Sequence, residues 1–169
     1  MQTREWTGLR DRTGWPAGPW DGEPDKRQWT DEATGLPCLI VRSNSLGFLC
    51  GYVGVSADHP WYGLDYGNQR LWDVDVHGGL TFSGLCDGDE TGICHVADEG
   101  EPETVKWFGF DCGHGGDVIP YRMTPAYRKR VGHLMLIEET ETYKDVAYVA
   151  EQCRGLASQL ARAALGVTA

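Results

Sequence analysis

Two histidines, each followed by a pair of glycines, are the residues in this chain best placed to do chemistry. His77 lies in Asp-Val-Asp-Val-His-Gly-Gly (73–79), and His114 lies in Phe-Asp-Cys-Gly-His-Gly-Gly-Asp (110–117). Each phrase follows a run that is typical of a β-strand, and neighbouring strands that end in turns can bring their last side chains together. The repetition predicts a single polar site at one mouth of a small sheet.

The side chains of the two phrases suit a divalent metal ion. His77, His114 and Asp117 offer two imidazoles and a carboxylate, a set that Zn²⁺ or Mn²⁺ accepts with a position left open for water. A bound ion lowers the pKa of that water towards neutrality. Asp75 and Asp111 then remain as catalytic carboxylates, one of which would serve as the general base. We therefore expect a divalent metal cofactor here.

The glycines and one tryptophan are the residues that we assign to a ligand. Glycine lets a ligand approach the backbone closely because it has no Cβ, and an aromatic ring can stack on a base. The expected partner is a small anionic ligand such as a nucleotide. The ligand-binding residues predicted on this basis are Gly78, Gly79, Gly115, Gly116 and Trp107.

Simpler interpretations of the same residues stay open. The two histidines can hydrogen-bond backbone groups in tight turns, with Asp75 and Asp117 capping neighbouring amides. A metal-free site is a further alternative, with His77 and His114 as general acid and base, each oriented by an aspartate. Cys86, Cys94 and His95 form a second candidate cluster, although the acidic stretch 84–104 is more typical of a solvated hairpin.

Composition limits the function classes. The chain has 169 residues, which suits a single domain (1–169), and its net charge of −10 disfavours a nucleic acid partner. It has no apolar run long enough to cross a membrane and no apolar signal segment at its start, so we expect a cytoplasmic protein that does not contact membranes. The six cysteines are then expected to be reduced, with Cys38, Cys50 and Cys153 buried as small hydrophobes.

Hydrophobic periodicity predicts an α+β fold: a twisted, mainly antiparallel sheet with one long C-terminal helix packed on it. The helix is expected to follow Thr142 as N-cap, because apolar residues from Val146 to Leu160 recur at steps of three and four. A short helix or loop is expected over 121–130. The predicted strands are 36–42, 46–55, 70–77 with its continuation 80–83, 105–112, and a short one at 133–137.

The first 35 residues are rich in tryptophan, proline and glycine, which is typical of an extended, turn-rich segment rather than a helix. We expect its later part to cover an apolar face of the sheet. Residues 1–17 are expected to form an N-terminal arm that moves independently of the sheet.

Several phrases resemble a family of small uncharacterised phage and prophage proteins with the motifs His-Gly-Gly-Leu-Thr-(Phe/Tyr) and Phe-Gly-Phe-Asp-Cys-x-His-x-x-Asp. The phrases are Val76–Ser83, Trp107–Asp117 and Tyr143–Val149, with a looser likeness at Gly18–Trp20 and Leu36–Val55. The resemblance implies a setting, the cytoplasm of a phage-infected bacterium, and no particular chemistry.

Three function classes follow. The first is a small metal-dependent hydrolase acting on a nucleotide or related phosphoester. The second is a non-catalytic phage protein that binds and sequesters a nucleotide-like host signal. The third is an acidic interaction protein that inhibits a host enzyme.

Overall fold

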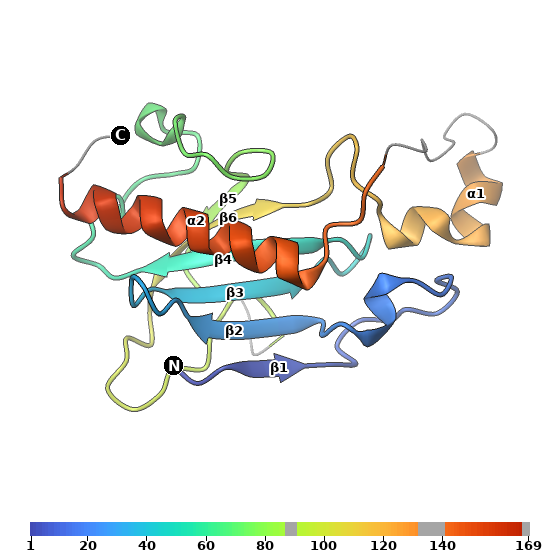
Figure 1. Cartoon of the computed structure of the whole chain (residues 1–169), viewed down its shortest axis with the longest axis horizontal. Helices are drawn as coiled ribbons and strands as arrows, with labels where there is room; N and C mark the ends of the chain where they lie inside the picture. Colours follow the sequence, from blue (N-terminus) through green and yellow to red (C-terminus); the bar gives the residue numbers. More distant parts are fainter. Residues whose placement is uncertain (87–90, 132–140, 167–169) are drawn as a thin grey trace.

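Within the residues that the structure describes (1–86, 91–131 and 141–166), six strands form one antiparallel sheet in the order β1-β2-β3-β4-β6-β5. The structure is a computed structural model, and Figure 1 shows the sheet with a long helix across it. The strands are β1 (Arg4–Trp6), β2 (Lys26–Thr30), β3 (Pro37–Arg42), β4 (Leu49–Val55), β5 (Phe82–Gly84) and β6 (Lys106–Asp111).

Helix α2 (Val146–Ala164) lies on one face of the sheet, over β3 and β4 (Figure 1). Its apolar stripe, which includes Val149, Cys153 and Leu160, is fully buried against the sheet. The predicted α+β fold with a C-terminal helix is therefore confirmed. The N-cap, however, is Asp145 and not Thr142: the Asp145 carboxylate accepts a hydrogen bond of 2.8 Å from the Tyr148 amide.

Apolar side chains fill both faces of the sheet. The larger cluster lies under α2 and includes Phe108 and Phe110, whereas Leu39, Tyr52 and Trp107 belong to a second cluster. Gly51 of β4 lies at a close approach between the backbone and the core. A Cβ at Gly51 would overlap the Phe110 ring, so a larger residue would push the core apart.

The predicted strand 70–77 is wrong. This segment forms the short 3₁₀ helix η2 (Gln69–Leu71) and turns, although Val74 and Val76 are buried and Asp73 and Asp75 exposed as the alternation requires. Its backbone pairs with side chains of α2 instead of with a strand. Gln159 accepts from the Asp75 amide at 2.8 Å and donates to the Asp75 carbonyl at 2.7 Å.

Residues 1–17 are tied to the sheet and do not form a separate arm. Strand β1 pairs with β2, which the sequence did not indicate. The fully buried Asp25 carboxylate then accepts hydrogen bonds from the amides of Leu9 and Arg10, and it pairs with the guanidinium of Arg12. The 3₁₀ helix η1 (Pro19–Gly22) buries Trp20.

Two further helical segments, η3 (Pro120–Met123) and α1 (Pro125–Val131), lie where a short helix or loop is expected. The strand expected over 133–137 lies outside the described residues.

The cysteines behave differently from one another. Cys86 and Cys94 form a disulfide, so the expectation that all six cysteines are reduced is wrong. Cys38 and Cys153 are buried free thiols, as predicted, and burial raises the pKa of Cys38 to about 12. Cys50 is only partly buried.

A buried charge cluster joins the N-terminal segment to β3 and to the start of α2. The fully buried Arg42 pairs with Glu23 at 2.8 Å and with Asp25 at 3.2 Å, and it donates to the Tyr143 hydroxyl at 2.9 Å. The other Glu23 carboxylate oxygen accepts a hydrogen bond from the Val146 amide at 3.0 Å. One guanidinium thus fixes where α2 begins relative to the sheet.

Replacement of Arg42 by methionine is expected to lower the free energy of unfolding by about 3 kcal/mol or more, because two buried carboxylates lose a partner. Urea denaturation measures this change. The control is Arg154→Met, which removes an exposed pair with Glu151 and should cost less than about 1 kcal/mol. Equal losses in the two variants would contradict the structural role of Arg42.

Candidate functional site

The three predicted metal ligands converge in the structure. His77, His114 and Asp117 each offer one ligand atom, and these atoms all lie within 4.8 Å of one another. The two imidazole rings are 5.6 Å apart between centroids. His77 lies in the turn that follows Val76, whereas His114 and Asp117 lie in the turn after β6, so two segments distant in sequence build one group that could hold a metal ion.

His77 is held from both sides of its ring. Its Nε2 donates to Asp117 Oδ2 at 2.9 Å, and its Nδ1 lies 3.0 Å from the Tyr148 hydroxyl. Its backbone amide donates to the Gln152 side chain at 2.8 Å. Burial raises the pKa of Tyr148, so the phenol stays protonated and can donate to Nδ1. Such partners fix a ring and its tautomer, as they do around metal-bound histidines.

The Asp117 carboxylate also closes the turn that carries His114. Its side chain is 2% exposed, and Oδ2 accepts a hydrogen bond of 3.0 Å from the His114 amide. The simpler interpretation of Asp117 as a cap is therefore correct in part, and it coexists with the contact to His77. The other oxygen, Oδ1, lies 3.8 Å from Lys144 Nζ.

His114 carries an unsatisfied nitrogen. Its Nδ1 is shielded from water and, within the part of the chain that the structure describes, has no hydrogen-bond partner. Carboxylate oxygens of Asp111 and Asp117 lie 3.8 and 3.9 Å from it, too far for a hydrogen bond. Because the side chain is 35% exposed, the ring is open to solvent elsewhere. A metal ion near Nδ1 would give it a partner.

Gly78 has a packing role that differs from the predicted one. Its φ is +66°, and a Cβ at this position would overlap the His114 ring. Gly78 therefore lets the imidazole lie against the backbone, where a ligand was expected. Gly79, Gly115 and Gly116 have open space where a Cβ would lie, which leaves these three turn positions accessible.

The remaining predicted residues are distributed unevenly. Asp111 lies at the edge of the cluster, where Oδ1 accepts from the Gly113 amide at 3.0 Å and faces His114. Asp75 is exposed and is not among the clustered ligands, because no strand aligns it with His77. Trp107 is fully buried in the second apolar cluster, with its ring edge on His95, and so does not contact the cluster around His77.

The sequence analysis missed the contribution of the segment that enters α2. Lys144, Tyr148 and Gln152 all reach the site, and they are spaced by four residues. Tyr148 and Gln152 are four residues apart in α2 and share one side of the helix, so a polar stripe beside the apolar one was the available signal for these two. Lys144 precedes the helix, so helical spacing does not predict its position.

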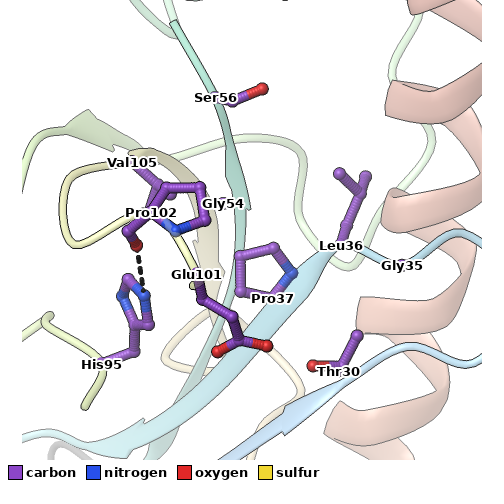
Figure 2. Close-up of a pocket in the computed structure, with 10 residues that line it drawn as sticks. All are labelled: Thr30, Gly35, Leu36, Pro37, Gly54, Ser56, His95, Glu101, Pro102 and Val105. Carbon is purple, nitrogen blue, oxygen red and sulfur yellow. Dashed lines mark hydrogen bonds between the residues drawn. The ribbon is translucent and has the colours of Figure 1, made fainter. Parts of the chain in front are cut away.

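The second candidate cluster is not a metal site. The sulfurs of Cys86 and Cys94 are bonded to each other, and His95 donates from Nε2 to the Pro102 carbonyl at 3.0 Å. Figure 2 shows His95 and Glu101 at the wall of a separate pocket. Burial lowers the pKa of His95, and Glu101 is already paired with the Met1 amino group. The pocket walls therefore supply little free charge.

Comparison with protein-family models, with curated proteins and with solved structures finds no match. The resemblance to phage proteins therefore stays a prediction from the motifs. No helix within residues 1–86, 91–131 and 141–166 is long and apolar enough to cross a membrane.

Gly78→Ala and Gly79→Ala separate backbone strain from the contact with His114. Both glycines have positive φ, so each substitution should cost about 1–2 kcal/mol of stability. Only Gly78→Ala also displaces the His114 ring, and it should weaken Zn²⁺ binding whereas Gly79→Ala should not. Urea denaturation and Zn²⁺ titration measure the two effects, and equal affinities in both variants would contradict the packing role of Gly78.

Proposed function

We propose that this chain is a small metal-dependent hydrolase that acts on a nucleotide or a related phosphoester. The divalent ion would be held by His77, His114 and Asp117. One observation carries the proposal: the three ligand groups converge, and His114 Nδ1, among the described residues, is buried without a partner. Such an atom is costly to bury unless something binds it.

The residues present fit Zn²⁺ or Mn²⁺. Ligand atoms lie about 2 Å from Zn²⁺, so a group within 4.8 Å needs only small side-chain rotations to surround an ion. The hydrogen bond between His77 and Asp117 would give way to two metal bonds. His77 would then carry its proton on Nδ1 and donate a hydrogen bond to the Tyr148 hydroxyl, which already lies 3.0 Å from Nδ1.

The expected chemistry is attack on phosphorus by an activated water. The ion would lower the pKa of a bound water and polarise a phosphoryl oxygen. Asp111, 28% exposed and 3.8 Å from His114 Nδ1, is the carboxylate beside the cluster that could take the proton of that water. Asp75, the other carboxylate predicted to be catalytic, is exposed and lies outside the cluster of described ligand residues, so it is not assigned a role.

The ligand class follows from charge and shape. The chain as a whole is strongly acidic, with a net charge of −10, so an anion needs a local source of positive charge, which the ion would supply. The turn residues Gly115 and Gly116 are exposed and have open space where a Cβ would lie, so phosphate oxygens can approach the backbone there. The Gly79 amide is not free for this role, because it donates to the Val76 carbonyl at 2.9 Å.

The two other function classes are weighed against the same site. Sequestration of a nucleotide-like signal would use the same metal ion and the same turns, but the nucleotide would not be hydrolysed. An assay for turnover therefore distinguishes sequestration from hydrolysis. The acidic interaction protein is less favoured, because Asp98 and Glu101 of the acidic stretch are paired internally with Arg4 and the Met1 amino group.

The Cys86–Cys94 disulfide bears on the compartment in which the protein works. A disulfide such as Cys86–Cys94 is usually kept reduced in a bacterial cytoplasm. The proposed metal site does not use either cysteine, so it is independent of the compartment.

The purified chain is expected to bind Zn²⁺ or Mn²⁺ stoichiometrically, as measured by elemental analysis and calorimetric titration. His77→Ala and Asp117→Asn should abolish binding because each removes a ligand. The matched control is Asp75→Asn, which neutralises an exposed carboxylate outside the cluster and should leave binding unchanged. Unchanged binding in His77→Ala would contradict the assigned site.

Incubation of the metal-loaded chain with a panel of nucleotides and phosphoesters, followed by chromatography, tests turnover. Asp111→Asn should retain the metal and lower kcat by a factor of about 10²–10⁴, the usual contribution of a general base. Asp75→Asn is again the control and should keep full activity. Tight binding of a nucleotide that is recovered unaltered would instead support sequestration.

A further inference from the structure

A lysine stands next to the metal cluster, and neither the turn motifs nor the metal ligands account for it. Lys144 precedes the N-cap of α2, and its Nζ lies 3.8 Å from Asp117 Oδ1 and 5.2 Å from the centroid of the Tyr148 ring. It also donates to the Thr142 hydroxyl. The side chain is only 19% exposed, so a cation that is largely shielded from solvent faces the same carboxylate that contacts His77.

The fold holds this lysine at the site. The Thr142 amide donates to the Gly116 carbonyl, and the Thr142 carbonyl accepts from the Val118 amide, both at 3.0 Å. Residues 116–118 and 142 therefore run side by side as a short bridge. Lys144, two residues further on, is carried to the turn that bears His114 and Asp117.

The net charge of the site would change sign when a divalent ion binds. Without a metal ion, Asp111 and Asp117 carry two negative charges and Lys144 carries one positive charge, so the site is net negative and repels anions. A divalent ion reverses this sign, and it also takes over the neutralisation of Asp117. The lysine is then released to pair with a second anion, at a distance of a few ångströms from the ion.

We propose that Lys144 is the phosphate-binding residue of this site and that it acts only when the metal ion is present. This inference rests on the proposed function. Lysine is a compact point charge with three rotatable donors, which suits the oxygens of a terminal phosphate. The ion would hold one oxygen of the phosphate and Lys144 another. Recognition of the phosphate thus depends on prior binding of the metal.

Inorganic phosphate is the probe for this proposal, with Zn²⁺ titrated separately. The wild-type chain should bind phosphate only when it is loaded with Zn²⁺. Lys144→Met keeps the apolar stem over Tyr148 and should weaken phosphate binding by about tenfold to a hundredfold, the usual effect of a charge-assisted hydrogen bond. Its Zn²⁺ affinity should be unchanged or higher, because a competing cation has left Asp117.

Lys106→Met is the matched control. Lys106 is similarly sheltered, at 13% exposed, and lies 3.9 Å from the Asp65 carboxylate. It is at the opposite end of β6 from Asp111, about 17 Å away along the strand. This variant should bind Zn²⁺ and phosphate like the wild type.

The outcomes separate the two proposals. A wild-type chain that binds no Zn²⁺ or Mn²⁺ overturns the proposed function, and the role of Lys144 with it. A chain that binds Zn²⁺ and phosphate, and does so equally well as Lys144→Met, overturns the role of Lys144 alone. Phosphate binding by the metal-free chain would also overturn it, since the net charge would then not control recognition.

Discussion

Helix α2 supplies the hydrogen-bond partners that a neighbouring strand would otherwise give to the segment before His77, and the candidate site depends on this contact. Gln152 and Gln159 bond the amides of His77 and Asp75. A backbone amide without a strand partner needs another acceptor, and here side chains of the helix provide it. The position of His77 is therefore set by the packing of α2 on the sheet, which Arg42 in turn helps to fix.

The Asp117 carboxylate shows why structural and functional interpretations of the site are compatible. It is almost fully buried, and a carboxylate in that position must be compensated. It caps the His114 amide, accepts from His77 and faces Lys144. These partners hold the carboxylate in place with Oδ2 directed at the two imidazoles. A turn cap of this kind is already most of a metal ligand, because Oδ2, the oxygen that closes the turn, is also the one that contacts His77.

Much of the fold could be predicted because β3, β4, β6 and α2 have apolar patterns of the expected period. Strands β1 and β2 could not be predicted from the sequence in this way. Lys26 and Gln28 of β2 are fully buried polar residues, and their burial depends on bonds to the carbonyls of Cys94 and Val96, far away in the sequence. No local pattern contains that information. The stretch 70–77 misled for a related reason: alternation reports burial, and burial by a helix looks the same as burial in a sheet.

The repeated His-Gly-Gly phrase predicts the site, but there is a physical limit to what repetition in a sequence can indicate. The repetition of His-Gly-Gly suggested equal roles for the two glycine pairs, yet Gly78 packs against His114 whereas Gly115 and Gly116 meet open space. Trp107 was predicted to stack on a base because it is aromatic, but it is buried in the second apolar cluster, on the other face of the sheet from Phe108. Spacing can bring residues to one end of a strand. It cannot tell which of them contact each other.

The two histidines differ in a way that bears on the order of folding and metal binding. His77 has partners on both ring nitrogens, so the segment that carries it is satisfied without an ion. Among the described buried polar atoms of this cluster, His114 Nδ1 alone is left without one. The apolar core under α2 involves neither residue. Metal binding would therefore exchange one hydrogen bond for coordination in a chain that is already folded, unlike small structural zinc domains, whose folding requires the metal.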